Sequence, residues 1–137
     1  MDVTFSKTVS ESDVYLFAGI TGDLSPNHVN AEFMKATPYG QRVAHGALIV
    51  GYMSAASSLA VDRGLKVIEG MSPVSLGYDR VRFLKPVFFG DTISVNYKVT
   101  RTDTQARRSY ADISVTNQRG ETVAAATHVM KWIGRDQ

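Results

Sequence analysis

The chain has 137 residues, of which 44% are apolar and 20% are charged, and its formal net charge is +2. This length allows one hydrophobic core, and the composition is typical of a soluble globular protein rather than a disordered one. The 15 basic residues are scattered along the sequence, whereas a nucleic-acid-binding protein would gather them into a stripe. The sequence contains no cysteine, which excludes disulfides and thiolate chemistry.

The sequence predicts neither a targeting segment at its N-terminus nor a membrane-spanning run. The N-terminus lacks the basic and apolar regions of a signal peptide. The longest apolar run, residues 47–61, is interrupted by serines and is shorter than the roughly 18 residues of a membrane span. We therefore expect a single cytoplasmic domain over residues 1–137, with no membrane or nucleic-acid partner.

The first third of the chain predicts a strand followed by short helices. Residues 3–9 alternate apolar and polar side chains, which favours a half-buried strand. Ser10 and Asp13 resemble a capping box, so a helix is expected from there to about Gly19. Turn-forming residues then separate it from a second short helix over residues 30–36.

Residues 46–63 predict one long helix that is apolar nearly all round. A helix on the protein surface would carry a polar stripe. We therefore expect other elements to enclose this helix on most sides. Many of its residues are small, which lets neighbouring backbone approach closely.

The second half of the chain changes to the two-residue period of strands. The last two of the expected strands are joined by a segment short enough for a hairpin. The pattern predicts an α+β fold in which one long helix packs on a curved antiparallel sheet. The expected strands cover residues 75–84, 92–102, 109–117 and 122–132.

Asp23 and His28 flank a Ser-Pro turn that can bring their side chains together. General acid/base catalysis requires a carboxylate and an imidazole that share one water or substrate atom. A nearby aspartate would also orient the imidazole and favour its protonated form. The same spacing is equally that of a turn-forming aspartate and a surface histidine, so the spacing alone leaves both interpretations open.

Other polar residues give weaker signals. His45 precedes the long helix and is expected to cap it or to pack, and His128 in the last strand is expected to be structural or surface-exposed. The three histidines lie far apart without an i, i+4 pair, so a metal site has little support. Ser54 and Ser57 lie in no nucleophile elbow, so a serine hydrolase is not expected.

Three segments of the chain carry a family resemblance in the same order. Residues 17–28 read FAGITGDLSPNH, residues 42–48 read RVAHGAL, and residues 83–91 read FLKPVFFGD. The first resembles the hydratase motif of the MaoC-like, (R)-specific enoyl-CoA hydratase family. The second is similar to the lead-in to that family's central helix, and the third to one of its strand-exit segments.

This resemblance implies a hot-dog fold, in which a sheet wraps around the long helix. It also implies a homodimer or dimer of dimers with active sites by the subunit interface, an acyl-CoA thioester substrate, and no cofactor or metal. Asp23 and His28 match the family's catalytic pair. They would activate a water that adds to the β-carbon of a trans-2-enoyl thioester and gives a (3R)-hydroxyacyl product.

Physical reasoning adds a binding role at the start of the long helix. The thioester oxygen gains charge during water addition and needs aligned donors. A helix N-terminus offers free N–H groups and a positive dipole end, and a glycine lets substrate come close. We therefore expect the Gly46 amide to be the oxyanion donor. Ser54 matches a family position near the active site, and is expected to place the water or a catalytic side chain, or simply to pack.

Two residues depart from the family motif. Ser25 stands where the family usually has asparagine, and Asn27 where it usually has an aliphatic residue. Asn27 is expected to face either a polar acyl substituent or solvent. Arg80, Arg82 and Lys85 are expected to form a solvated sheet face, with one or two as candidate contacts to coenzyme A phosphates. The alternatives are a hot-dog acyl-CoA thioesterase and a non-catalytic acyl-thioester-binding or partner subunit.

Overall fold

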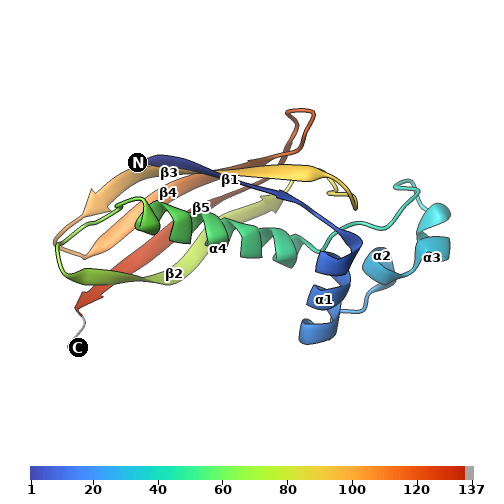
Figure 1. The fold of residues 1–137 in the computed structure, drawn as a ribbon, viewed down its shortest axis with the longest axis horizontal. Coiled ribbons are helices and arrows are strands. Elements are labelled where there is room, and N and C mark those ends of the chain that lie inside the picture. Colours follow the sequence, from blue (N-terminus) through green and yellow to red (C-terminus); the bar gives the residue numbers. More distant parts are fainter. Residues whose placement is uncertain (135–137) are drawn as a thin grey trace.

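In the computed structural model, which describes residues 1–134, five strands form one antiparallel sheet in the order β1-β3-β4-β5-β2. Figure 1 shows α4 (Gly46–Asp62) lying along the sheet, while the three shorter helices project beyond one end of it. This is the α+β, hot-dog arrangement expected from the sequence. The strands are β1 (Asp2–Thr8), β2 (Met71–Phe83), β3 (Thr92–Asp103), β4 (Arg108–Thr116) and β5 (Thr122–Gly134).

The alternating residues of β3 and β4 build the core beneath α4. Ile93, Val95 and Tyr97 are almost fully buried, while the residues between them are partly exposed. Since successive side chains of a strand point to opposite faces, one face of the sheet is apolar and packs on the helix. Val95 lies opposite Val115 in the register, so the buried side chains of both strands meet on that face.

The predicted helix α1 (Glu11–Thr21) begins at the capping box. The Ser10 side chain accepts a hydrogen bond from the Asp13 N–H at 3.1 Å, and the Asp13 carboxylate accepts one from the Ser10 N–H at 3.0 Å. The helix ends at Gly22, whose φ of 83° favours glycine. The capping box therefore fixes where the chain leaves β1 and enters the projecting helices.

One segment expected to be a turn is a short helix. Residues Pro26–Val29 form α2, with the proline at the first helical position, where its missing N–H and fixed φ cost nothing. The next helix, α3 (Ala31–Lys35), begins as expected at Asn30, whose side-chain oxygen accepts a hydrogen bond from the Phe33 N–H at 2.9 Å.

Helix α4 is enclosed less completely than its composition predicts. Its buried side chains, including Ile49, Met53 and Ala56, face the sheet. A single sheet covers only one side of a helix, so the opposite stripe stays exposed within this chain. Before its last residue, Asp62, that stripe contains only small residues, namely Ala47, Gly51, Ser54 and Ser58.

Strand β2 begins at Met71 rather than at residue 75, and it lies at an edge of the sheet. Its register against β5 shifts twice, between Ser75 and Gly77 and between Asp79 and Arg82. Such irregularities break the clean alternation that reveals a strand in a sequence. The missed residues 71–74 precede both shifts and include Pro73, a residue that argues against a strand in a sequence.

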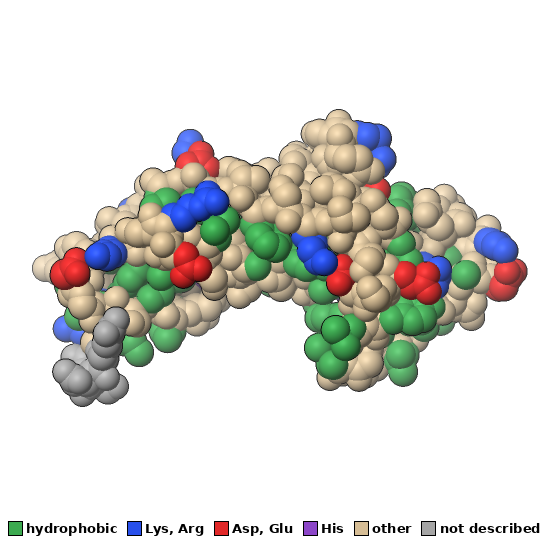
Figure 2. All heavy atoms as spheres, viewed as in Figure 1, with side chains coloured by type: hydrophobic (Ala, Val, Ile, Leu, Met, Phe, Trp, Pro, Cys, Tyr) green, Lys and Arg blue, Asp and Glu red, His purple; other side chains and the backbone are tan. Residues whose placement is uncertain are grey.

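Apolar side chains remain exposed on two parts of the chain. Leu16 and Ile20 of α1 are 67% and 74% exposed, and Val74 and Leu76 of β2 are 43% and 51% exposed. Figure 2 shows hydrophobic side chains on the projecting α1 region and on the sheet body, with a concave surface between them. Within residues 1–134, no helix has the length and hydropathy needed to span a membrane.

Candidate active site

Helix α2 carries His28, and a backbone carbonyl from another segment holds its ring. Nδ1 of His28 donates a hydrogen bond to the Val43 carbonyl at 2.7 Å. A carbonyl oxygen accepts only, so the hydrogen of the neutral ring is on Nδ1. Nε2 then carries the lone pair and is available to accept a proton. The orienting acceptor is thus the Val43 carbonyl, whereas the sequence suggested the Asp23 carboxylate.

Asp23 directly follows Gly22, which ends α1. One carboxylate oxygen accepts a hydrogen bond from the Ser25 N–H at 3.3 Å, which folds the loop back on itself. A carboxylate oxygen of Asp23 and a ring nitrogen of His28 lie within 4.8 Å of each other. One water can bridge two polar atoms at that separation. The turn therefore brings the two predicted side chains to a separation that one water can bridge.

His45 packs at the start of α4 instead of capping it. It occupies the N-cap position, but its side chain makes no capping hydrogen bond. Its ring stacks on His28, with centroids 3.7 Å apart and planes inclined by 26°. The expectation that the three histidines are separate is therefore wrong for this pair, because the fold brings together two segments that are distant in the chain.

The stacking of His28 on His45 does not suit a shared metal ion. Asp23, His28 and His45 have potential ligand atoms within 4.8 Å of one another. An imidazole binds a metal through a lone pair that lies in the plane of its ring. Two nearly parallel rings direct these lone pairs side by side, so a metal bound by one ring lies out of the plane of the other.

Gly46 is the first residue of α4 and lies beside a cavity of about 260 Å³. Within residues 1–134, its N–H donates to no acceptor. A Cβ at this position would lie 2.6 Å from the Phe83 ring, so the ring packs closely on the backbone of Gly46. The cavity is lined mainly by apolar side chains, with Asn27, Tyr39 and Lys85 as the polar ones.

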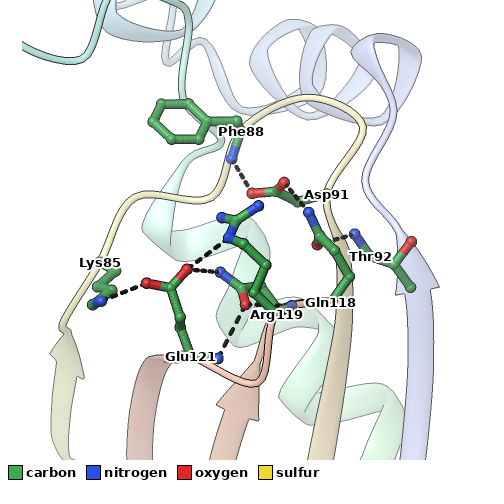
Figure 3. Close-up of polar contacts among 8 residues, drawn as sticks. Lys85, Phe88, Asp91, Thr92, Gln118, Arg119 and Glu121 are labelled. Carbon is green, nitrogen blue, oxygen red and sulfur yellow. Dashed lines mark hydrogen bonds and ion pairs between the residues drawn. The ribbon is translucent and has the colours of Figure 1, made fainter.

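The loop after β2, which supplies one wall of this cavity, is fixed by polar contacts (Figure 3). Lys85 donates to Glu121 at 2.6 Å, and this bond is the largest cause that lowers the pKa of Glu121 to about 2. Asp91 accepts hydrogen bonds from the Phe88 N–H at 2.9 Å and from Gln118 at 2.8 Å. These contacts tie the loop to the turn between β4 and β5.

Ser54 lies away from the predicted catalytic pair within one chain. It is exposed, and eight residues of α-helix separate it from Gly46 by about 12 Å. It lines a different cavity of about 260 Å³ together with Ser57, Ser75 and Met130. Within a single subunit, Ser54 therefore makes no contact with Asp23 or His28 through which it could place the water or a catalytic side chain.

His128 is structural. Its ring is fully buried and stacks on Tyr78 with centroids 4.4 Å apart. Both nitrogens are occupied, Nε2 by the Ser75 hydroxyl at 2.8 Å and Nδ1 by the Tyr97 hydroxyl at 2.7 Å. Burial lowers the pKa of His128 to about 4. The basic residues near β2 are exposed as expected, since Arg80, Arg82 and Lys85 all face solvent.

Comparisons with known proteins agree with this architecture. Residues 1–124 match the MaoC like domain family. The chain is 35% identical over 97 residues to an (R)-specific enoyl-CoA hydratase of Rhodospirillum rubrum, an alignment that covers 71% of this chain and 62% of that protein. The chain therefore spans only about 62% of the length of that curated relative.

Two solved structures share the fold. The R-hydratase PhaJ1 from Pseudomonas aeruginosa superposes with a TM-score of 0.78 at 27% identity, covering 98% of this chain and 81% of that one. An (R)-hydratase from A. caviae involved in PHA biosynthesis superposes with a TM-score of 0.82 at 23% identity, covering 96% and 93%. With a matching family over most of its length and this fold, the chain belongs to the MaoC-like family of hot-dog proteins.

Proposed function

We propose that this protein is a hydratase/dehydratase that adds water to trans-2-enoyl-CoA thioesters and gives (3R)-hydroxyacyl-CoA. The observation that carries this proposal is the proximity of the Asp23 carboxylate and the His28 ring, within 4.8 Å of each other. The family membership and the named relatives support the same reaction.

In the proposed reaction, Asp23 and His28 hold one water between them. The lone pair on Nε2 of His28 draws a proton from this water as its oxygen adds to the β-carbon. The electrons of the double bond move toward the thioester, and the α-carbon takes up a proton from the same pair. Dehydration reverses these steps. Water addition transfers no electrons to or from an acceptor, so the reaction needs no redox cofactor.

The Gly46 amide is the proposed donor to the thioester oxygen. Its N–H has no acceptor within the described residues and stands at the positive end of α4. Charge that develops on the thioester oxygen is stabilised by a donor fixed there in advance. The adjoining cavity supplies a largely apolar wall for the substrate.

We also propose that the protein works as a homodimer with its active sites by the subunit interface. The exposed apolar residues of α1 and β2 leave unusual amounts of hydrophobic surface on a single chain. The exposed stripe of α4 consists of small residues from Ala47 to Ser58, which permit close packing of another subunit. In such a dimer, Ser54 of the partner subunit would lie near the catalytic pair, which Ser54 of the same chain does not contact.

The proposed substrate is a coenzyme A thioester whose acyl group carries a polar substituent. Asn27 lines the cavity beside Gly46 and is exposed, so its side-chain amide is open to a polar group of the substrate. Lys85, at the same cavity, pairs with Glu121 at 2.6 Å, and its exposed ammonium group is the proposed contact to the phosphates of the carrier.

The purified protein should consume the conjugated enoyl absorbance of crotonyl-CoA or of a hydroxylated or dicarboxylic enoyl-CoA. The product should have R configuration, and an S product would contradict the proposed stereochemistry. Release of free thiol from acyl-CoA without hydration would instead identify a thioesterase. Saturable acyl-CoA binding without turnover would identify a non-catalytic binding subunit.

A further inference from the structure

The ring of His45 contacts α2, which carries His28, and α1, which ends just before Asp23. It is only 1% exposed, and it lies between His28, at a centroid distance of 3.7 Å, and Phe17 of α1, at 4.7 Å. The ring of Phe17, on α1, packs against the imidazole of His45. His45 therefore stacks directly on the ring that the Val43 carbonyl holds by its Nδ1.

His45 also holds the backbone of the other member of the pair. Its Nε2–H donates a hydrogen bond to the carbonyl oxygen of Asp23 at 3.0 Å. Its Nδ1 is buried and has no partner within the described residues. The tautomer with hydrogen on Nε2 makes the bond to Asp23 and leaves only a lone pair unpaired, whereas the other tautomer would bury an unpaired N–H.

We propose that His45 is a positioning residue that sets Asp23, His28 and the Gly46 donor in one geometry. It stacks on the ring of His28, bonds to the backbone of Asp23, and directly precedes Gly46 at the start of α4. The inference rests on the proposed hydratase function. Because displacing a catalytic group by about 1 Å can cost about 100-fold in rate, both contacts of His45 should matter.

Three substitutions separate the two contacts. His45→Phe keeps an aromatic ring against His28 but loses the donor to Asp23. His45→Gln keeps a donor near the Nε2 position but loses the stacking ring. His45→Ala loses both. We expect kcat to fall about 100-fold in His45→Ala and about 10-fold in each conservative variant, with KM changed less than about threefold.

His128→Gln provides a matched control, since His128 is also buried and hydrogen-bonded but lies in the sheet. We expect this variant to lower the unfolding temperature while kcat per folded molecule remains unchanged. A purely structural His45 would behave in the same way. The kcat loss in the His45 variants must therefore be measured on the folded fraction, determined by thermal unfolding of each preparation.

Nitrogen-15 NMR of the histidine side chains tests the inference without relying on turnover. In the native protein, His28 should show hydrogen on Nδ1 and His45 should show hydrogen on Nε2. In His45→Ala, the His28 signals should move toward the averaged values of a mobile ring, and His45→Phe should preserve the native His28 tautomer.

Two results would overturn this assignment. One is a native His28 spectrum in His45→Ala. The other is a native kcat in all three variants of an active enzyme. If the native protein catalyses no hydration at all, the proposed function fails, and the His28 spectrum of His45→Ala still decides whether His45 positions the ring.

Discussion

Replacing Gly46 with alanine tests how closely the start of α4 is packed. The added Cβ would lie 2.6 Å from the Phe83 ring, against an ordinary contact of 3.4–4 Å. The ring must therefore withdraw by about 1 Å. Phe83 is 55% exposed and can move outward, so we expect a loss of about 1 kcal/mol, at the low end for overpacking.

The stability loss should depend on the Phe83 ring. In a Phe83→Ala background the added methyl meets no ring, so Gly46→Ala should then cost close to nothing. The two substitutions should thus show a coupling free energy of about 1 kcal/mol in urea unfolding. An equal cost of Gly46→Ala with and without Phe83 would refute this account of the contact.

Activity should respond differently from stability in the same four proteins. The added methyl sits on the residue whose N–H is proposed to bind the thioester oxygen. We expect kcat/KM for enoyl-CoA hydration to fall about 10-fold or more in Gly46→Ala. This loss should persist when Phe83 is also replaced, because the methyl remains beside the donor. Recovery of full activity in the double variant would mean that Gly46 serves packing alone.

Three further predictions concern other parts of the chain. The pKa of His128 is about 4 in the folded chain and near 6.5 in the unfolded one, so the free energy of unfolding should fall by about 3 kcal/mol as the pH drops from 6.5 to 4. Urea unfolding across that range measures this loss, and a flat profile would contradict the buried neutral ring. Asn27→Leu should reduce kcat/KM for polar-substituted enoyl-CoA about 10-fold relative to crotonyl-CoA, and an equal effect on both substrates would argue against a role in specificity. Lys85→Ala should raise KM a few-fold for coenzyme A thioesters but not for pantetheine thioesters of the same acyl group, which lack the nucleotide phosphates. An equal rise in KM for both carriers would exclude phosphate contact.

The regular elements were predictable because their signals are local. The alternation of Ile93, Val95 and Tyr97 marks a strand with one buried face, and the capping box at Ser10 marks where α1 begins. Helix α2 was missed because Pro26 suggests a turn as readily as a first helical residue. The start of β2 was missed because it contains Pro73, which argues against a strand in a sequence.

The candidate site was predictable only in part, because its geometry depends on contacts between distant segments. The spacing of Asp23 and His28 indicated a pair, yet nothing local indicates that Val43 holds the His28 ring or that His45 stacks on it. The packing of Phe83 on Gly46 likewise joins two segments that only the fold brings together. The one sequence signal for His45 was its position directly before Gly46.

The central claim is that Asp23 and His28 act as one acid/base pair. Its most direct test is the rate of enoyl-CoA hydration in Asp23→Asn and His28→Ala, each checked for native folding by thermal unfolding. The account predicts that each substitution lowers kcat by about 100-fold or more, and that the double variant is scarcely slower than either single one, because the two groups act on the same water. Activity that survives in both single variants would contradict it.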